Sequence, residues 1–405
     1  MSEMNVDMIE PSPAMGGTTQ IKVIGVGGGG GNAVNHMIDS QVQGVDFICA
    51  NTDAQTLVRT QAGTTIQLGF DGLGAGAKPE RGQEAAESAA DEIRQALQGA
   101  NMVFITAGMG GGTGTGAAPV VARIAKEMGI LTVAVVTKPF DWEGPQRMRC
   151  AEAGLAELEA NVDQSLVVLN DKLHETNDED VSFDEAFAQA NNVLRYAVGG
   201  ISEVINGYGL VNVDFADVRT IMQMPGKAMM GTATAKGPDR ARIAAEQAAA
   251  SPLLEGSDLS GAKGVLVLVT ASKSTLKLNE TREAMRTATA YASKDEATII
   301  FGASYDEDMG DEIRVTIIAT GLPRPGAQRQ TPTMSVVQGS LQRTGTDDPR
   351  PFLGASRFGD GNAPQVWQSG RVGRSAASQA GGGMGAFPIV GDDADIPSFL
   401  RKQAD

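Results

Sequence analysis

The chain of 405 residues has few of the residues that build disulfide frameworks and metal centres, with two cysteines and two histidines. Cys49 lies in the apolar stretch 45–49, and we interpret it as a buried free thiol. A structural zinc site takes about four Cys or His ligands, so the sequence predicts neither a disulfide framework nor a protein-bound metal ion. Aromatic residues are also scarce, at 4% of the chain.

Long hydrophobic runs and an excess of basic charge are missing as well. No stretch approaches the roughly 18 uninterrupted apolar residues of a transmembrane helix, and residues 1–20 have neither the basic start nor the apolar centre of a signal peptide. We therefore expect a cytoplasmic protein with no direct membrane insertion. The 33 Lys and Arg face 49 Asp and Glu, a net charge of −16, which argues against a nucleic-acid partner.

Glycine is abundant, with 51 residues, and two dense clusters of it follow predicted strands. The first comes after the apolar stretch 21–26, where residues 25–30 fit the G-x-G-x-x-G fingerprint before a helical pattern. Glycine lets the backbone approach a phosphate, and the N–H groups at a helix start attract it. By itself this fingerprint also fits a dinucleotide-binding protein, with Asp53 after the second strand as the ribose-binding acid.

The second cluster, residues 110–116, reads Gly-Gly-Gly-Thr-Gly-Thr-Gly between a predicted strand and a predicted helix. It offers consecutive N–H donors, two hydroxyls and a helix N-terminus. A dinucleotide-binding fold needs one such loop, whereas two at neighbouring strand ends make a polyphosphate cradle. Neither cluster has the G-x-x-x-x-G-K-[ST] pattern of a P-loop.

The arrangement of apolar segments predicts an α/β fold: a parallel-sheet nucleotide-binding domain joined by a long central helix to a smaller α+β domain. The long helix is predicted where apolar residues recur every three to four positions from residue 184 to 206. In the first domain we expect further strands at 45–50, 102–107, 130–137 and 164–169, and helices at 80–97 and 117–128 with Pro119 in the first turn. In the second, a small-residue stretch at 226–237 precedes helices at 239–250 and 278–292 and strands at 264–270, 298–303 and 312–320.

We divide the chain into six segments. They are a disordered N-terminal tail (1–20), the nucleotide-binding domain (21–183), the central helix with the loop after it (184–222), the α+β domain (223–322), a flexible linker (323–389) and a C-terminal peptide (390–405). The linker is rich in Gly, Ser, Gln and Arg and is not expected to form a core. Ile396, Phe399 and Leu400 have the spacing of a helix that forms in a partner's groove, and the alternative is a merely polar tail end.

The heptapeptide 110–116 matches the signature loop of the tubulin/FtsZ family of GTPases, and the chain resembles the bacterial FtsZ members of that family. The resemblance covers about residues 20–322 and returns at 395–405. It implies a protein that binds GTP and GDP, uses Mg²⁺, and polymerises head to tail into the filaments of the septal ring at mid-cell. It also implies that membrane-anchoring and regulatory division proteins bind the C-terminal peptide, through Asp395, Ile396, Pro397, Phe399, Leu400, Arg401 and Lys402.

The resemblance implies roles for residues on both glycine clusters and on the segments after later strands. Gly28–Asn32 and Gly112–Gly114 would hold the phosphates, and Glu143 and Arg147 would contact the ribose and the nucleotide. Asn170 would lie near the sugar. The complete predicted nucleotide site is Gly28, Gly29, Gly30, Gly31, Asn32, Gly111, Gly112, Thr113, Gly114, Thr115, Gly116, Glu143, Arg147, Asn170, Phe187 and Asn191.

The base would lie against the start of the long helix. Phe187 and Asn191 are four residues apart and share a helix face, so the ring can stack on a base while the amide bonds its edge. The family has Asp or Asn at the Asn191 position. An amide has one acceptor oxygen for the two donors of guanine, so we expect guanine preference with weaker pairing than a carboxylate gives.

The predicted catalytic residues, Asn212, Asp214 and Asp217, lie beyond the far end of the same helix. The two acids are three residues apart at a predicted helix start, and the alternative interpretation is an N-cap with a first-turn acid. About 20 residues of helix, or ~30 Å, separate them from Phe187, so they cannot reach the phosphates of their own chain. The resemblance implies that they enter the next subunit's pocket and orient the water that attacks the γ-phosphate.

Two alternatives remain. An NAD-dependent oxidoreductase would use residues 25–30 and Asp53, but it leaves residues 110–116 unexplained and lacks an evident set of residues for hydride chemistry. A structural relative that binds GTP without hydrolysing it should lack the acids that follow Asn212, and both are present.

Overall fold

The computed structural model describes residues 19–69, 71–174, 182–206, 211, 213–254, 262–290 and 297–322. Outside these residues lie residues 1–18 of the predicted N-terminal tail, Asn212, and the whole of the predicted linker and C-terminal peptide. The strands are β1 (Ile21–Val26), β2 (Asp46–Asn51), β3 (Thr64–Gln67), β4 (Met102–Gly108), β5 (Leu131–Lys138), β6 (Gln164–Leu169), β7 (Lys227–Lys236), β8 (Gly264–Ala271), β9 (Thr298–Tyr305) and β10 (Glu312–Leu322).

The helices of the described residues alternate with these strands through the first half of the chain. They are α1 (Gly27–Asp39), α2 (Ala54–Val58), α3 (Pro79–Ser88), α4 (Ala90–Leu97), α5 (Thr113–Glu127), α6 (Pro145–Asn161), α7 (Asn170–His174), α8 (Phe183–Asn206), α9 (Phe215–Met222), α10 (Arg240–Ala249) and α11 (Leu278–Ala290). Short 3-10 turns are η1 (Asp141–Glu143), η2 (Pro252–Leu254) and η4 (Glu307–Met309).

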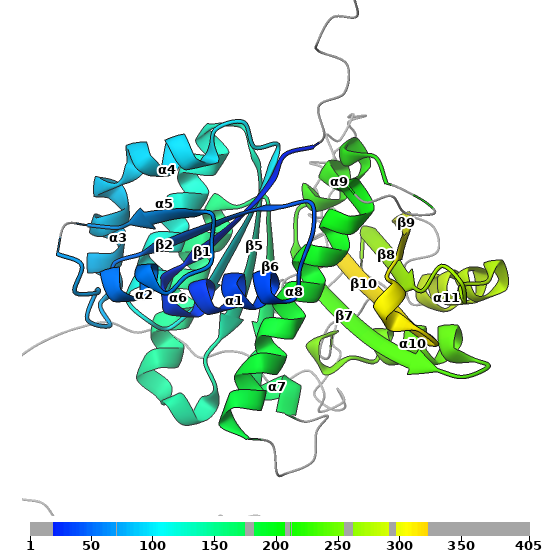
Figure 1. Cartoon of the computed structure of the whole chain (residues 1–405). Helices are drawn as coiled ribbons and strands as arrows, with labels where there is room; N and C mark the ends of the chain where they lie inside the picture. Colours follow the sequence, from blue (N-terminus) through cyan, green and yellow to red (C-terminus); the bar gives the residue numbers. More distant parts are fainter. Residues whose placement is uncertain are drawn as a thin grey trace, which may run out of the picture. The chain divides into compact units, whose positions relative to one another are not determined.

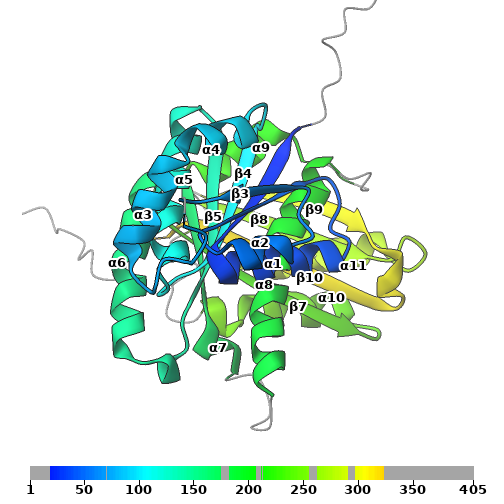
Figure 2. The same cartoon turned by 60° about the vertical axis from the view of Figure 1, so that its left-hand side comes forward.

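All these strands join one sheet in the order β3-β2-β1-β4-β5-β6-β7-β10-β8-β9 (Figure 1). From β3 to β6 the neighbours run parallel, which confirms the parallel sheet predicted for the first half. Helices cover both of its faces (Figure 2). Because side chains alternate along a strand, Ile21 and Val23 of β1 join a core under α1 and α8, and Ile24 and Val26 join a second core under α3 to α6.

The second half of the sheet has a different topology. β10 pairs antiparallel with β7 and β8, and β8 pairs parallel with β9. Helices α10 and α11 bury a third core against one face of these strands. The two halves meet where β6 pairs with β7 through Leu166 and Ala228.

Helix α8 packs against both halves of the sheet, so the predicted long central helix is confirmed. It is 24 residues long. Its buried residues Leu194 and Ile201 share one core with Val133 of β5 and with Leu268 of β8. A reciprocal capping box starts the helix, because the Ser182 hydroxyl accepts from the N–H of Glu185 at 3.3 Å while the Glu185 carboxylate accepts from the N–H of Ser182 at 2.9 Å.

Three local predictions were wrong, and one segment for which no element was predicted is a strand. The five glycines from Gly27 to Gly31 are not a loop but the first residues of α1. The helix expected at 80–97 is broken at Ala89 into α3 and α4. Because α5 begins at Thr113, Pro119 lies inside it rather than in its first turn. The small-residue stretch 226–237 forms β7, in which a Cβ at Gly231 would strike the carbonyl oxygen of Ala248 on α10.

Candidate functional site

A cavity of about 460 Å³ opens at the carboxyl ends of β1, β4, β5 and β6. Ligands of open parallel sheets bind at this edge, where the loops that follow the strands converge. The start of α8 forms the remaining wall. The lining residues are Gly28, Gly29, Asn32, Gly108, Met109, Gly111, Gly112, Thr113, Gly114, Thr137, Pro139, Glu143, Arg147, Asn170, Phe187, Ala190, Asn191 and Leu194.

The first glycine cluster places the amino end of α1 at this cavity. No side chain caps that end, so its first-turn N–H groups are directed at whatever ligand the cavity holds. Gly28 has open space around its Cα, whereas a Cβ on Gly30 would strike the carbonyl oxygen of Thr106 on β4. The glycines therefore serve two purposes, access at Gly28 and close helix-to-sheet packing at Gly30.

The second cluster places the amino end of α5 opposite the first. Gly110 has a φ of +96°, and its N–H donates to the Thr115 hydroxyl at 2.8 Å, which folds the loop back on the helix. The Thr113 and Thr52 hydroxyls are 2.6 Å apart. Two helix starts that face one cavity make an anion site built mainly from backbone N–H groups.

A charged pair lines the wall that follows β5. Arg147 Nε lies 3.1 Å from Glu143 Oε2 across one turn at the start of α6. The other carboxylate oxygen of Glu143 accepts from the N–H of Phe140 at 2.8 Å. Glu143 is nearly buried and Arg147 is half exposed, so the carboxylate is fixed and orients the guanidinium at the mouth of the cavity.

Asn170 contributes an unsatisfied acceptor. It follows β6 as the first residue of α7, and it is 4% exposed. Its side-chain oxygen has no hydrogen-bond partner. A buried carbonyl oxygen without a donor costs about 1–3 kcal/mol, so this oxygen is a candidate acceptor for a ligand in the cavity.

The start of α8 supplies an apolar surface and one amide. Phe187, Ala190, Asn191 and Leu194 all line the cavity, at the three- and four-residue spacings of one helix face. Phe187 is 36% exposed, and its ring meets the buried Phe140 edge-on, with centroids 5.2 Å apart.

Most of the predicted nucleotide site therefore lies in one cavity, but four members do not line it. Gly30 and Gly31 are buried in the first turns of α1. Thr115 and Gly116 line a neighbouring hollow of about 890 Å³, which shares Gly111, Gly112, Glu143 and Arg147 with this cavity. Several lining residues were not predicted, namely Gly108, Met109, Thr137, Pro139, Ala190 and Leu194. Position was the available signal, since the first four lie at or just beyond the carboxyl ends of β4 and β5 and the last two share the face of Phe187.

The predicted catalytic acids lie far from this cavity. Asp214 is the N-cap of α9, where its carboxylate accepts from the N–H of Ala216 at 3.3 Å, and Asp217 is in the first turn. Both side chains are exposed. Phe187 lies near the amino end of α8 and the two acids follow its carboxyl end. The 19 residues of helix from Phe187 to Asn206 span about 30 Å. The capping role considered from the sequence is thus present for Asp214.

Asp53, which the dinucleotide alternative needs as a ribose ligand, has another role. Its carboxylate caps α2 and accepts from the N–H of Gln55 at 2.9 Å and the hydroxyl of Thr56 at 3.0 Å. These hydrogen bonds hold the pKa of Asp53 below its usual value. Asp53 is also not among the lining residues of the cavity, so this alternative loses its acid.

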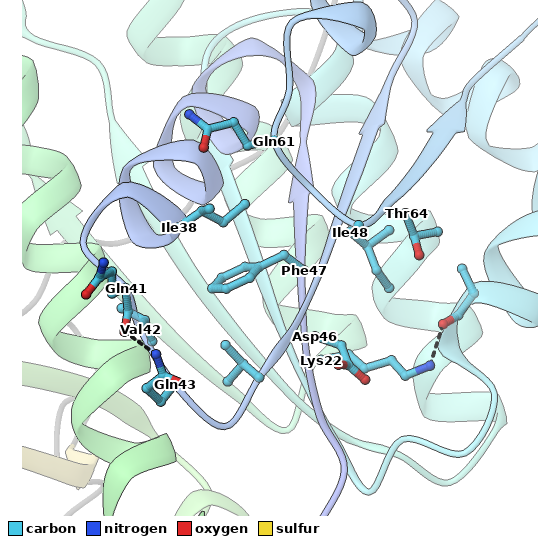
Figure 3. Close-up of a pocket in the computed structure, with 13 residues that line it drawn as sticks. Lys22, Ile38, Gln41, Val42, Gln43, Asp46, Phe47, Ile48, Gln61 and Thr64 are labelled. Atoms are coloured by element: carbon cyan, nitrogen blue, oxygen red, sulfur yellow. Dashed lines mark hydrogen bonds between the residues drawn. The ribbon is translucent and has the colours of Figure 1, made fainter.

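A larger hollow, of about 730 Å³, lies at the opposite edge of the sheet, around the first residues of β1, β2 and β3 (Figure 3). Its lysine is already engaged, because Lys22 Nζ donates to the carbonyl oxygens of Ala96 and Gln98 at 2.8 and 3.0 Å. Among its lining residues there is one glycine, Gly63, and no helix start. This hollow therefore lacks the features of an anion site.

Across the described residues, no group of three or more His, Cys, Asp or Glu side chains is placed to hold a metal ion. The same part of the chain contains no helix that is long and apolar enough to cross a membrane.

Comparison with known proteins identifies both halves of the sheet. The family model for the GTPase domain of the Tubulin/FtsZ family matches residues 20–178, and the model for the C-terminal domain of the FtsZ family matches residues 226–323. The cell division protein FtsZ of Pseudomonas putida is 48% identical over 99% of this chain and 99% of its own length. The FtsZ of Pseudomonas aeruginosa is also 48% identical, over 96% of this chain and 98% of its own.

Solved structures agree with these matches. An empty FtsZ dimer from M. jannaschii is 43% identical, with a TM-score of 0.71 over 74% of this chain and 88% of its own. CetZ2 from Haloferax volcanii, solved as a GTPgS-bound protofilament, is 24% identical, with a TM-score of 0.64 over 76% of this chain and 95% of its own. The second likeness concerns the fold alone.

Proposed function

The chain belongs to the FtsZ family of tubulin-like GTPases, and from that premise we propose how its own residues bind GTP and hydrolyse it. It is a GTPase and a GTP-dependent cytoskeletal protein of cell division, and it associates with copies of itself. The NAD-dependent and non-hydrolysing alternatives are set aside by this membership.

In our proposal the triphosphate lies between the amino ends of α1 and α5. Backbone N–H groups of Gly28, Gly29 and Asn32 and of Gly111–Gly114 donate to the phosphate oxygens, with the hydroxyl of Thr113 beside them. The field of the two helix starts offsets part of the phosphate charge. Arg147 is the one cationic side chain among the lining residues, so the backbone supplies most of the binding.

The proposed contact with the ribose rests on the side-chain oxygen of Asn170. This buried acceptor lines the cavity and has no donor. A ribose hydroxyl is a donor of the right kind, and pairing the two would remove the cost of the unsatisfied oxygen. The Glu143–Arg147 ion pair lines the opposite side of the proposed ribose site. The N–H of Phe140 donates to the Glu143 carboxylate and holds the pair in place.

The base then stacks on Phe187, with Asn191 at its edge. The amide oxygen of Asn191 accepts from one of the two donors on the guanine edge. We therefore expect GTP to be preferred over ATP, by less than a carboxylate at this position would give.

Hydrolysis is proposed to require two subunits. Asp214 and Asp217 are exposed and lie about 30 Å of helix away from Phe187 of the same chain, so they serve the nucleotide of the next subunit in a head-to-tail filament. There they orient a water molecule that attacks the γ-phosphorus, while the bond from that phosphorus to the bridging oxygen of GDP breaks. A contact that joins two different faces and does not close builds a filament.

Magnesium fits this site as a companion of the nucleotide. The lining residues include a single acid, Glu143, whose carboxylate is already paired with Arg147 and with the N–H of Phe140. A Mg²⁺ ion would therefore be held by phosphate oxygens and water, with the Thr113 hydroxyl nearby, as is common for this ion. When bound, it offsets the charge of the β- and γ-phosphates.

The remaining roles rest on family membership. We propose that the filaments form in the cytoplasm at the mid-cell division site. We also propose that residues 395–402, which lie outside the described residues, bind membrane-anchoring and regulatory division proteins at the end of the flexible linker.

The decisive experiment mixes wild-type protein with Asp217→Ala. Asp214 also caps α9, so Asp217 is the cleaner position. The variant alone should bind GTP normally and lose about 100-fold or more of the turnover rate, as expected for a group that activates the nucleophile. Added in excess, it should also lower the phosphate release per wild-type subunit, because wild-type nucleotides then face altered acids.

Glu92→Ala, on the exposed face of α4, is the matched control and should leave turnover unchanged. Light scattering with GTP, GDP and ATP reports assembly in parallel. If the Asp217→Ala protein left wild-type turnover untouched while it co-assembled, or if specific activity stayed constant from dilute to concentrated protein, hydrolysis would be intrachain.

A further inference from the structure

Four aromatic side chains form a closed ring of contacts beside the base end of the cavity. Phe140 stacks on Trp142, with centroids 5.3 Å apart and 17° between the planes. Trp142 meets Phe183 at 5.3 Å, Phe183 meets Phe187 at 4.9 Å, and Phe187 returns to Phe140 at 5.2 Å. In a chain with 4% aromatic residues, this is a marked concentration.

The ring joins two segments that are more than 40 residues apart in the sequence. Phe140 and Trp142 follow β5, and Phe183 and Phe187 are one turn apart at the start of α8. Phe140 is 1% exposed, and its N–H is held by the Glu143 carboxylate. Phe140 is therefore the fixed member of the four-residue cluster. The capping box of Ser182 and Glu185 fixes where α8 begins.

The other two members are not core residues. Trp142 is 61% exposed and Phe183 is 62% exposed, and neither lines the cavity itself. Their burial therefore contributes little to the stability of the fold. What they contact is Phe140 on one side and Phe187 on the other.

We propose that Trp142 and Phe183 are positioning residues of the base site, which hold the ring of Phe187 in place for stacking and thereby set how long a nucleotide stays bound. The inference rests on the proposed role of Phe187 in base binding. Phe187 is partly exposed in the second turn of α8, so its ring needs lateral contacts to keep one orientation. Edge-to-face and tilted pairs supply them, and a preformed aromatic wall spares the nucleotide the entropy of ordering it.

The test measures the release of radiolabelled GDP from the full-length chain, at a concentration too low for assembly. Aromatic pairs contribute about 0.5–1.5 kcal/mol beyond their buried area, which corresponds to release that is about two- to tenfold faster in Trp142→Ala and in Phe183→Ala. Trp142→Phe keeps a stacking ring and should release GDP at close to the wild-type rate. Leu278→Ala, at another exposed apolar residue, on α11, is the control and should not change the rate.

A double-mutant cycle separates positioning from general weakening. In a Phe187→Ala background, Trp142→Ala should accelerate release by less than about 1.5-fold, because residues that act through one another are not additive. The thermal midpoint of the nucleotide-free protein should stay unchanged in the single variants. Full additivity in the cycle, or faster release only in variants with a lowered midpoint, would overturn the proposal.

Two further outcomes are informative. If Trp142→Ala and Phe183→Ala release GDP at the wild-type rate but assemble poorly with GTP, the exposed rings contact the neighbouring subunit and the positioning role is wrong. If Phe187→Ala itself leaves GDP release unchanged, the proposed base site fails; if it accelerates release while the other two variants do not, only this inference fails.

Discussion

The side-chain oxygen of Asn170 destabilises the fold while it has no donor, and in our proposal it accepts a hydrogen bond from the nucleotide. In the absence of a ligand this oxygen is buried and unpaired, which is destabilising. The described chain contains a second such atom at Thr106, on β4 behind the cavity wall. The two positions share a physical defect and differ in access to a ligand.

We predict that Asn170→Ala weakens GDP binding about tenfold and changes the stability of the nucleotide-free protein little, because one charge-neutral hydrogen bond to a ligand is lost while a desolvated oxygen is removed. Thermal unfolding with and without GDP measures both quantities. Thr106→Val is the control and should leave GDP affinity unchanged. Equal loss of GDP affinity in both variants would contradict a role for Asn170 at the sugar.

The glycines of α1 make a second prediction at this scale. Gly28→Ala adds a methyl group to open space and should stabilise the nucleotide-free protein by up to about 1 kcal/mol through helix propensity, while it weakens nucleotide binding. Gly30→Ala, two residues away, should destabilise the protein by about 1–3 kcal/mol because its methyl group meets the backbone of β4. Denaturant unfolding and a GDP titration measure the stability and the GDP affinity of both variants. Equal effects of the two substitutions would contradict the separate roles of Gly28 in ligand access and Gly30 in packing.

Residue roles could be read from the sequence only where a pattern carries chemistry. Gly111–Gly114 and the Phe187–Asn191 spacing pointed to the cavity they line. Thr137, Ala190 and Leu194 were missed because nothing distinguishes their side chains from ordinary strand and helix residues. The capping of α2 by Asp53 was missed because the local hydrogen bonds of a carboxylate leave no trace in composition.

At the scale of elements, helices and strands with a strong hydrophobic pattern were predicted correctly, whereas those that depend on close tertiary packing were not. Strands β1, β4 and β5 are apolar runs, the first two of which lead into glycine clusters, and α8 has a sustained helical period. Strand β7 has small residues of low strand propensity, and its place between β6 and β10 follows from tertiary packing against α10. The break between α3 and α4 lies at Ala89, where the sequence has neither a proline nor a glycine to indicate it.

A partly buried carboxylate on α8, that of Glu203, gives a prediction about the contact between that helix and the second half of the sheet. Glu203 accepts from the Ser304 hydroxyl of β9 at 3.0 Å. Burial raises the pKa of Glu203, while Ser304 and the nearby Arg314 and Arg195 oppose the rise and Asp306 adds to it.

The sign of the pH dependence follows from that shift. Because the pKa is higher in the folded state, the contribution of Glu203 to stability is fully present below its unfolded pKa of about 4.3 and is lost as the pH rises through the folded value. We therefore expect Glu203→Gln, which keeps the acceptor and removes the charge, to raise the thermal midpoint at neutral pH. The gain should vanish below about pH 4. Glu92→Gln, which is exposed on α4, should show no such pH-dependent gain, and a lowered midpoint for Glu203→Gln at neutral pH would contradict the shift.

On the scale of the whole molecule, α8 separates the proposed nucleotide site from the proposed catalytic acids. The cavity with the two glycine clusters lies at its amino end, and the exposed Asp214 and Asp217 follow its carboxyl end. The sequence predicted this separation from helix length alone, since a rise of about 1.5 Å per residue fixes the distance. How subunits meet could not be predicted in the same way, because an interface depends on the shapes of two surfaces.

Net charge makes the last prediction. A chain of −16 that stacks on itself works against its own repulsion, which salt screens within about 10 Å at 0.1 M. We expect the critical concentration for GTP-dependent assembly, measured by light scattering at fixed KCl and Mg²⁺, to fall as choline chloride is raised from about 0.02 to 0.1 M. Glu92→Lys, which changes the net charge by two units on the exposed face of α4, should lower the critical concentration at low salt and lose that advantage at high salt. A critical concentration that rises with salt in both proteins would mean that attraction between charged faces outweighs the overall repulsion.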